Sequence, residues 1–295
     1  SLPLIPHLLK IDLIKSILSL IKQFTGIEAI GIRLREGEDF PYYQTNGFPD
    51  EFVEVERYLC ARDKKGEMLR DSFGNVYLDC MCGNILCSRT DPSYPFFTKG
   101  GSFWSNCTTE LLASTSDEDR QTRTRNRCNG EGYESVALIP IRTENEIIGL
   151  LQLNDKRKNV FDIAMIENFE KIGLAIGIAL KNKELALSVT KNEKRYRELF
   201  ECMLNGYAYC KMIYDDARKP VDFIYLEVNN AFEKLTGLKD VVGKRVTEVI
   251  PEIRRLQPEL LEIYSKVALT GETEFILIDF IPLNIWLSIS IYNPG

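Results

Sequence analysis

Five cysteines in the first half of the chain are the residues best suited to chemistry. Cys80, Cys82 and Cys87 fall within the stretch LDCMCGNILCSRTDP, and Cys107 and Cys128 follow in the same region. Thiolates bind Zn²⁺ tetrahedrally at about 2.3 Å, and three or four of them can hold a long loop that lacks an apolar core of its own. We therefore predict a metal site with Cys80, Cys82 and Cys128 as ligands and Cys107 or Cys87 as the fourth.

Three other interpretations of the same cysteines stay open. Thiols within reach of each other form disulfides, and Cys82 with Cys128 makes a less strained pair than Cys80 with Cys82. The arginines between residues 120 and 127 would lower a thiol pKa and favour such redox chemistry. A thiolate also serves as an axial ligand of haem, although His7, the single histidine, lies far away in the sequence. Alternatively, the cysteines are small buried apolar side chains without a ligand.

Two neighbouring stretches supply further candidates for ligand binding. In RQTRTRNRCNGEG, Arg125 and Arg127 are suited to an anionic effector, or else belong to a solvated polar loop. In FFTKGGSFWSN, Phe103 and Trp104 either wall a ligand pocket or pack within the core. The glycine pair in that stretch does not lie between a strand and a helix, so we do not predict a nucleotide phosphate site.

The composition is that of a soluble globular chain and excludes several classes of protein. The 295 residues are enough for two domains, and 44% are hydrophobic while 27% are charged. The longest apolar runs, VALIPI and IIGLLQL, are too short to cross a bilayer. A formal charge of −6 argues against a nucleic-acid binder. Eight unevenly spread cysteines favour a reduced, cytoplasmic chain.

The elements that must position these residues follow from the apolar periodicity. An amphipathic helix is predicted over residues 8–24, where four apolar residues recur at helical spacing. Strands are predicted at residues 28–36, 41–47, 134–142 and 146–155. Between the two pairs of strands lies a long irregular insertion, residues 66–132, which carries five of the eight cysteines. A loop of this length in a compact domain is usually functional or held by some additional contact.

A proline-free stretch at residues 161–200 predicts a long helix that leaves one domain and enters the next. Four of its apolar residues follow the spacing of a coiled coil, namely Phe169, Ile172, Ile176 and Ala179. We therefore predict that this helix helps to form a parallel homodimer. The alternative is a helix buried within its own chain.

The second half repeats the mixed plan on a smaller scale. Strands are predicted at residues 206–215, 221–229, 272–280 and 284–293. A helix begins at an asparagine cap after the second of these strands and ends at Gly237. Both halves therefore pack helices on mainly antiparallel strands, which is the α+β class.

In this order the elements resemble a tandem of two sensory domains. The first half resembles a GAF domain through EAIGIRL, the paired ESVALIPI and IIGLLQLND, and the closing helix. The second half resembles a PAS domain through RYRELFECMLNGYAYCKMIYD and YLEVNNAFEKLTGLKDVVGKRVTEVIPE. More narrowly, DCMCGNIL, FFTKGGSFWSN and RTRNRCNGEGYESVALIPI resemble a cysteine-containing GAF subgroup of bacterial and archaeal sensor histidine kinases. The resemblance implies a GAF-like domain at 1–181, a connecting signalling helix at 182–197 and a PAS-like domain at 198–295.

Departures from these families limit what the resemblance implies. The second half carries no flavin-adduct cysteine motif and no histidine for haem, so we expect it to be cofactor-free or to bind a small metabolite. The first half lacks the bilin-attachment pattern and the charged signature of cyclic-nucleotide-binding GAF domains. The final PAS strand would follow the turn at YNPG, so an open sheet edge is expected.

Together these observations predict a cytoplasmic, dimeric and non-catalytic sensing fragment. It would detect a small ligand, a metal or a redox state in the GAF-like domain and pass the change to a downstream kinase or output domain. Histidine-kinase activity would lie outside residues 1–295, because these residues contain no nucleophile with a base and no phosphate loop. The alternative is a dimerisation scaffold with a structural zinc staple. Neither nucleic acid nor membrane insertion is expected.

Overall fold

The computed structural model describes residues 4–70, 74–144, 146–217 and 219–294, with side chains in the first helix from residue 13 onward. The chain divides into two compact units, Ser1–Ser188 and Val189–Gly295. This division falls inside a single helix, α6, Ile163–Cys202, which contributes residues to both units. It also falls inside the segment that the sequence predicts as a connecting helix.

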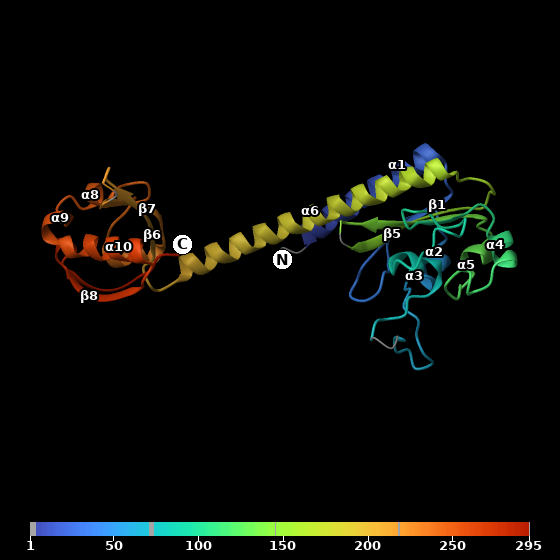
Figure 1. The fold of residues 1–295 in the computed structure, drawn as a ribbon, viewed down its shortest axis with the longest axis horizontal. Helices are drawn as coiled ribbons and strands as arrows, with labels where there is room; N and C mark the ends of the chain where they lie inside the picture. The colour runs from blue at the N-terminus through green and yellow to red at the C-terminus, as the bar shows by residue number, and fades with distance from the viewer. Residues whose placement is uncertain (1–3, 71–73, 145, 218, 295) are drawn as a thin grey trace. The chain divides into compact units, whose positions relative to one another are not determined.

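The first unit is built on one five-stranded sheet (Figure 1). Its strands are β1 Ala29–Leu34, β2 Tyr42–Asn46, β3 Phe103–Ser105, β4 Ser135–Arg142 and β5 Ile147–Asp155. They lie in the order β2-β1-β5-β4-β3, and every neighbouring pair is antiparallel. The central strands β4 and β5 are buried along most of their length because both faces of the sheet are covered, which explains their continuous apolar sequences.

Helices cover the two faces of this sheet in different ways (Figure 1). The long helices α1, Leu4–Thr25, and α6 lie along one face, where Ile14, Ile139 and Phe169 belong to one apolar core. Four short helices belong to the other side, namely α2 Asp50–Val55, α3 Cys80–Leu86, α4 Thr108–Ser114 and α5 Arg127–Gly130. The insertion predicted to be irregular therefore contains α3, α4, α5 and β3.

Helix α6 approaches the sheet closely because it carries glycine where it crosses β4. A Cβ atom on Gly173 would lie 2.6 Å from the carbonyl oxygen of Pro140, and one on Gly177 would overlap the carbonyl of Arg142. Phe169 and Ile176 are buried against the same sheet. Three residues of the predicted seam, Phe169, Ile172 and Ile176, therefore pack in the core beneath the protein's own sheet, while Ala179 is exposed. The seam was assigned from a spacing that an intramolecular face shares.

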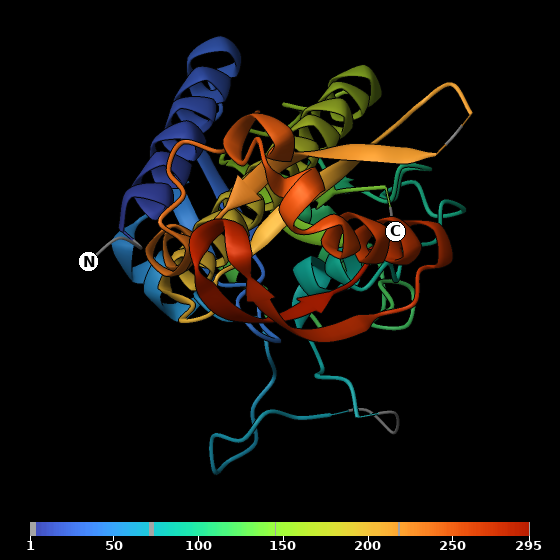
Figure 2. The same ribbon diagram turned by 90° about the vertical axis from the view of Figure 1, so that its left-hand side faces the viewer.

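Among its described residues, the second unit has two antiparallel hairpins, the end of α6 and four further helices. Figure 2 shows this part of the chain in front. The hairpins pair β6 Ala208–Tyr214 with β7 Pro220–Val228, and β8 Glu274–Phe280 with β9 Ile285–Ile291. The helices are α7 Asn230–Thr236, α8 Val246–Val249, α9 Ile253–Leu256 and α10 Pro258–Thr270, with a 3-10 turn at Ile281–Leu283. Among the described residues the hairpins form separate sheets, because no strand pairs with both.

Specific capping residues define α7. The Asn229 side chain accepts a hydrogen bond from the Phe232 amide at its start, and Gly237 ends it with a φ of 74°. The side-chain Nδ2 of Asn229 also donates to the carbonyl oxygen of Phe200, in the last turns of α6. The predicted α+β class, with two domains joined by a long helix, is confirmed. In the described part of the chain, no helix combines the length and apolar character that a bilayer crossing requires.

Candidate ligand site in the first unit

Three of the predicted cysteines line one pocket on the side of the sheet that carries the short helices. Cys80 and Cys82 lie in α3, Cys128 lies in α5, and Phe103 of β3 completes the wall with aliphatic side chains of α4 and β4. The pocket has a volume of about 60 Å³. An apolar cavity that holds benzene measures about 150 Å³, so this conformation suits only a small group and has no room for haem.

The local backbone explains how α3 presents its thiols. Cys80 begins the helix with a φ of 66°, a left-handed conformation that is uncommon outside glycine, and its amide donates to the carbonyl oxygen of Arg123 at 3.3 Å. One turn later, a Cβ on Gly83 would overlap the carbonyl of Leu78, so α3 folds back tightly onto the chain that precedes it. Strained backbone conformations of this kind are frequent at functional sites.

Burial keeps the three thiols protonated. Desolvation is the largest cause that raises the pKa of Cys80, Cys82 and Cys128, and the pKa of Cys128 reaches about 12. Mutual repulsion adds to the effect, because a thiolate on Cys80 would disfavour ionisation of the other two. At neutral pH these groups are therefore weak nucleophiles, and any metal that binds them must displace protons.

A buried polar network connects the thiols to the sheet. The Tyr42 hydroxyl donates to Gln152 Oε1 at 2.8 Å, and Gln152 Nε2 donates to the Cys128 sulfur at 3.7 Å. The Cys82 thiol points toward the same amide oxygen, at 4.0 Å. The guanidinium of Arg33, which is 1% exposed, lies 3.5 Å from the centre of the Tyr42 ring. Sequence reasoning missed Arg33, Tyr42 and Gln152, although a glutamine and an arginine within apolar strands were a usable signal.

The other two predicted cysteines lie apart from this pocket. The Cys107 thiol donates to Glu134 Oε2 at 3.4 Å, just before α4, and Cys87 is exposed at the end of α3. Among the described residues, no group of three or more histidine, cysteine, aspartate or glutamate side chains is arranged to hold a metal ion. The residues present therefore do not fit a four-ligand zinc site in this conformation. A metal at these cysteines stays a prediction.

The predicted arginines make ion pairs within the protein. Arg125 lies 3.2 Å from Asp79 and 3.5 Å from Glu56, and its side chain also donates to the carbonyls of residues 58 and 59. Arg127 lines the pocket, and it pairs with Glu131 at 2.9 Å. Most of the hydrogen-bonding capacity of Arg125 is thus used to attach the insertion to the segment around α2.

The two predicted aromatic residues lie on opposite faces of the sheet because successive side chains of a strand alternate. Phe103 lines the pocket and belongs to the core beneath the short helices. Trp104 packs against the core beneath α1 and α6. The edge strand β3 therefore contacts both layers, and only Phe103 faces the candidate site.

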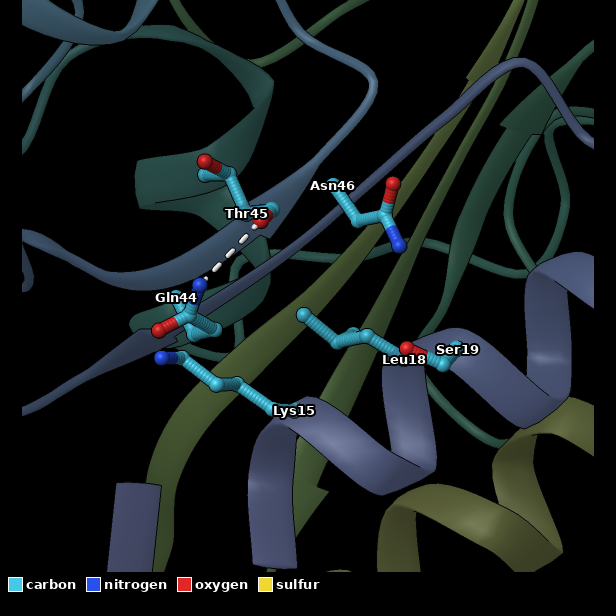
Figure 3. Close-up of a pocket in the computed structure, with 6 residues that line it drawn as sticks. All are labelled: Lys15, Leu18, Ser19, Gln44, Thr45 and Asn46. Carbon is cyan, nitrogen blue, oxygen red and sulfur yellow. Dashed lines mark hydrogen bonds between the residues drawn. The ribbon is translucent and has the colours of Figure 1, made fainter. Parts of the chain in front are cut away.

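A second pocket lies on the surface between α1 and β2 (Figure 3). Lys15, Leu18 and Ser19 of α1 face Gln44, Thr45 and Asn46 of β2 across a volume of about 220 Å³. The Gln44 amide donates to the neighbouring carbonyl of Thr45 at 3.3 Å. One lysine, one leucine and four uncharged polar residues line this pocket, and none of them carries a thiol. The cysteine pocket is therefore the better candidate for a ligand site.

Comparisons with known proteins give one family match. Residues 194–268 match the PAS domain family. No curated protein matches the sequence.

Several solved structures resemble the chain over about three-fifths of its length. A domain described as part of a two-component sensor histidine kinase of Sinorhizobium meliloti 1021 is 12% identical, with 61% of this chain and 96% of that chain covered and a TM-score of 0.40. A GAF domain region from Geobacter sulfurreducens PCA is 16% identical, with 60% and 95% covered and a TM-score of 0.40. A type II free methionine-R-sulfoxide reductase from Thermoplasma acidophilum is 10% identical, with 58% and 92% covered and a TM-score of 0.37. The family match at residues 194–268 agrees with the expected order of a GAF-like domain followed by a PAS-like domain.

Proposed function

We propose that residues 1–295 are a non-catalytic sensing and relay segment of a sensor histidine kinase or a related signalling protein. The first unit would detect a small ligand, a metal ion or a redox state, and the second would pass the change to output domains. The observation that carries this proposal is the gathering of Cys80, Cys82 and Cys128 around one small pocket. Titratable groups with a strongly perturbed pKa that line a pocket are candidates for a functional site, and burial raises the pKa of all three thiols.

The relay would run through α6. This helix is continuous from Ile163 to Cys202, packs on the sheet of the first unit and ends within the second. A helix is a stiff hydrogen-bonded rod, so a change in its packing at one end can bias contacts at the other. The match of residues 194–268 to the PAS domain family supports this role for the second unit.

A second copy of the chain is the partner proposed for the exposed face of α6. Leu174, Ile178, Leu185 and Val189 are between 39% and 64% exposed. Their successive spacings are 4, 7 and 4 residues, so they follow an 11-residue repeat. This repeat corresponds to about 3.67 residues per turn and keeps the apolar side chains on one side of a straight helix. A parallel homodimer would bury this stripe, which differs from the coiled-coil seam first expected.

The proposal includes no catalytic step, and it assigns no base that would deprotonate the thiols. Cys82 and Cys128 contact the amide of Gln152, which cannot accept a proton to activate them. All eight cysteines lie in the described part of the chain and carry thiols rather than disulfides. Reduced thiols suit the cytoplasm, where we place this function.

Elemental analysis combined with an absorption spectrum tests which chemistry the pocket uses. We would purify the chain and its Cys82→Ser and Cys107→Ser variants and add one equivalent of Zn²⁺ to each. Sensing through metal predicts that zinc raises the melting temperature of the chain and of the Cys107→Ser control but not of Cys82→Ser. A Soret band would instead indicate haem.

The same samples separate a sensor from a scaffold. A scaffold with a zinc staple would contain stoichiometric zinc as purified and would show no further response to added effector. A sensor requires differential binding and hence a change in stability or helix packing on addition. If neither zinc nor modification of the pocket thiols changes the melting temperature or the packing of α6, the sensing proposal fails.

A further inference from the structure

One hairpin of the first unit contacts both the cysteine pocket and α6. This hairpin, residues 94–105, includes β3 and is closed by the sequence TKGGS. Phe103 lines the pocket, and Phe97 pairs with it across the hairpin in the same core. Ser102, the residue next to Phe103, contacts α6 on the other side. The residue that lines the pocket, Phe103, therefore directly follows the residue that contacts α6, Ser102.

The polar contact with α6 is made by the carboxylate of Glu170. Glu170 Oε1 accepts hydrogen bonds from the hydroxyls of Thr98 and Ser102, the latter at 2.7 Å. The turn that presents these hydroxyls is closed by its own backbone, since the Thr98 amide donates to the Ser102 carbonyl at 2.9 Å. Hydrogen bonds to an ionised carboxylate are roughly twice as strong as those between neutral groups.

The turn fits closely around this carboxylate. A Cβ atom on Gly100 would overlap the Glu170 carboxylate, and Gly101 has a φ of 81°, which only glycine adopts readily. Arg142, at the end of β4, donates to the Gly100 carbonyl from the sheet. The turn is therefore held between the sheet and α6, with space for the carboxylate only because residue 100 lacks a side chain.

We propose that the Glu170 carboxylate, held by Thr98 and Ser102, couples the state of the cysteine pocket to the packing of α6. This inference rests on the proposed sensing function. A group that enters the pocket and displaces Phe103 would also shift the adjoining Ser102 and change its bond to Glu170. Coupling of this kind is reciprocal, so loss of the Glu170 contact also changes how readily the pocket opens.

The test uses the full chain with Cys87, Cys107 and Cys202 replaced by serine, so that the pocket thiols are the principal reactive groups. Methyl methanethiosulfonate serves as the probe: a thiolate attacks its sulfenyl sulfur, a mixed disulfide forms, and methanesulfinate leaves. Mass spectrometry establishes that the pocket thiols are modified. Hydrogen exchange of residues 166–177 then measures the packing of α6, and the expected result is exchange about tenfold faster after modification.

Two variants break the contact in different ways. Glu170→Ala removes the acceptor, and Gly100→Ala displaces the carboxylate without a change of charge. Both are expected to raise the basal exchange of residues 96–104 about tenfold or more, because two charge-assisted hydrogen bonds are lost. In both, modification of the pocket should change the exchange of residues 166–177 less than twofold. Glu167→Ala, one turn earlier at an exposed position of the same helix, should behave as the parent.

The outcomes distinguish failure of the coupling from failure of the sensing function. A full tenfold response in Glu170→Ala would overturn the coupling while the pocket remained a sensor. No response in the parent after complete modification would overturn both. Cys82→Met adds bulk to the pocket without any reaction, so it repeats the comparison if the buried thiols react too slowly. If Cys82→Met changes the hydrogen exchange of residues 166–177 by the same amount with Glu170 present and in the Glu170→Ala background, the proposed coupling is wrong.

Discussion

Replacement of Gly177 by alanine gives a direct test of how α6 packs on the sheet. Alanine is favoured over glycine inside a helix by about 1 kcal/mol, so the substitution would stabilise an unobstructed helix. Here the added Cβ would overlap the carbonyl of Arg142 in β4, an atom of the backbone that cannot rotate away. Overpacking of this kind costs about 1–3 kcal/mol, and a clash with backbone belongs at the upper end. We therefore expect a net loss of about 2 kcal/mol.

Tryptophan fluorescence during urea unfolding measures this loss in the first unit alone. The chain contains two tryptophans, Trp104 in the first unit and Trp286 in the second, so a Trp286→Phe background leaves one reporter. Trp104 packs against the same core as α6. For a unit of this size the expected loss corresponds to a melting temperature lower by about 4–8 °C.

A matched change separates helix propensity from the clash. Ala175 is exposed on α6, and Ala175→Gly should lose about 1 kcal/mol through propensity alone. The packing argument would be refuted if Gly177→Ala were more stable than the parent by the amount that Ala175→Gly is less stable. That result would mean that α6 lies farther from β4 than the structure places it.

Three further predictions concern the thiols, the polar network and the exposed stripe. Because burial raises the pKa of Cys128 to about 12, stability from the buried thiols is complete below the unfolded pKa of about 8.5 and is lost as the pH rises toward 12. Urea unfolding at pH 7 and pH 10 should show this loss, and serine at the three pocket cysteines should reduce it. Tyr42→Phe leaves Gln152 Oε1 without its 2.8 Å donor and should cost about 1–2 kcal/mol in the same assay; an unchanged midpoint would contradict the network. Leu185→Glu should shift the chain to monomer in analytical ultracentrifugation, while Leu187→Glu, also exposed but on the opposite side of α6, should not; equal effects would contradict the stripe.

The long helices α1 and α6, the capped helix α7 and every described strand except β3 could be predicted because each has a strong local pattern. The hairpin of β4 and β5 was expected from two apolar runs around a turn, and α7 from its asparagine cap and closing glycine. The short helices α3, α4 and α5 were missed because four to seven residues give too few turns for a period to be recognised. Helix α10 was also absent from the expected elements, although Pro258 and Gly271 mark its two ends.

The candidate site could be predicted only in part. The cysteine residues were recognisable by type, and Cys80, Cys82 and Cys128 do line one pocket. The protonation of these thiols and the small volume of the pocket depend on burial by segments far apart in the sequence. The spacing of the cysteines along the chain does not reveal this burial. The same holds for Glu170, whose proposed role follows from its contacts with Thr98 and Ser102, which lie 72 and 68 residues earlier in the chain.

Hydrogen exchange of the second unit after modification of the first tests the central claim most directly. The pocket thiols would be converted to methyl disulfides in the full chain, with a pocket variant that carries serine at residues 80, 82 and 128 as the control. Sensing and relay predict altered exchange in residues 194–268 of the parent and none in the control. Complete modification of the pocket with unchanged exchange throughout residues 194–268 would contradict the account.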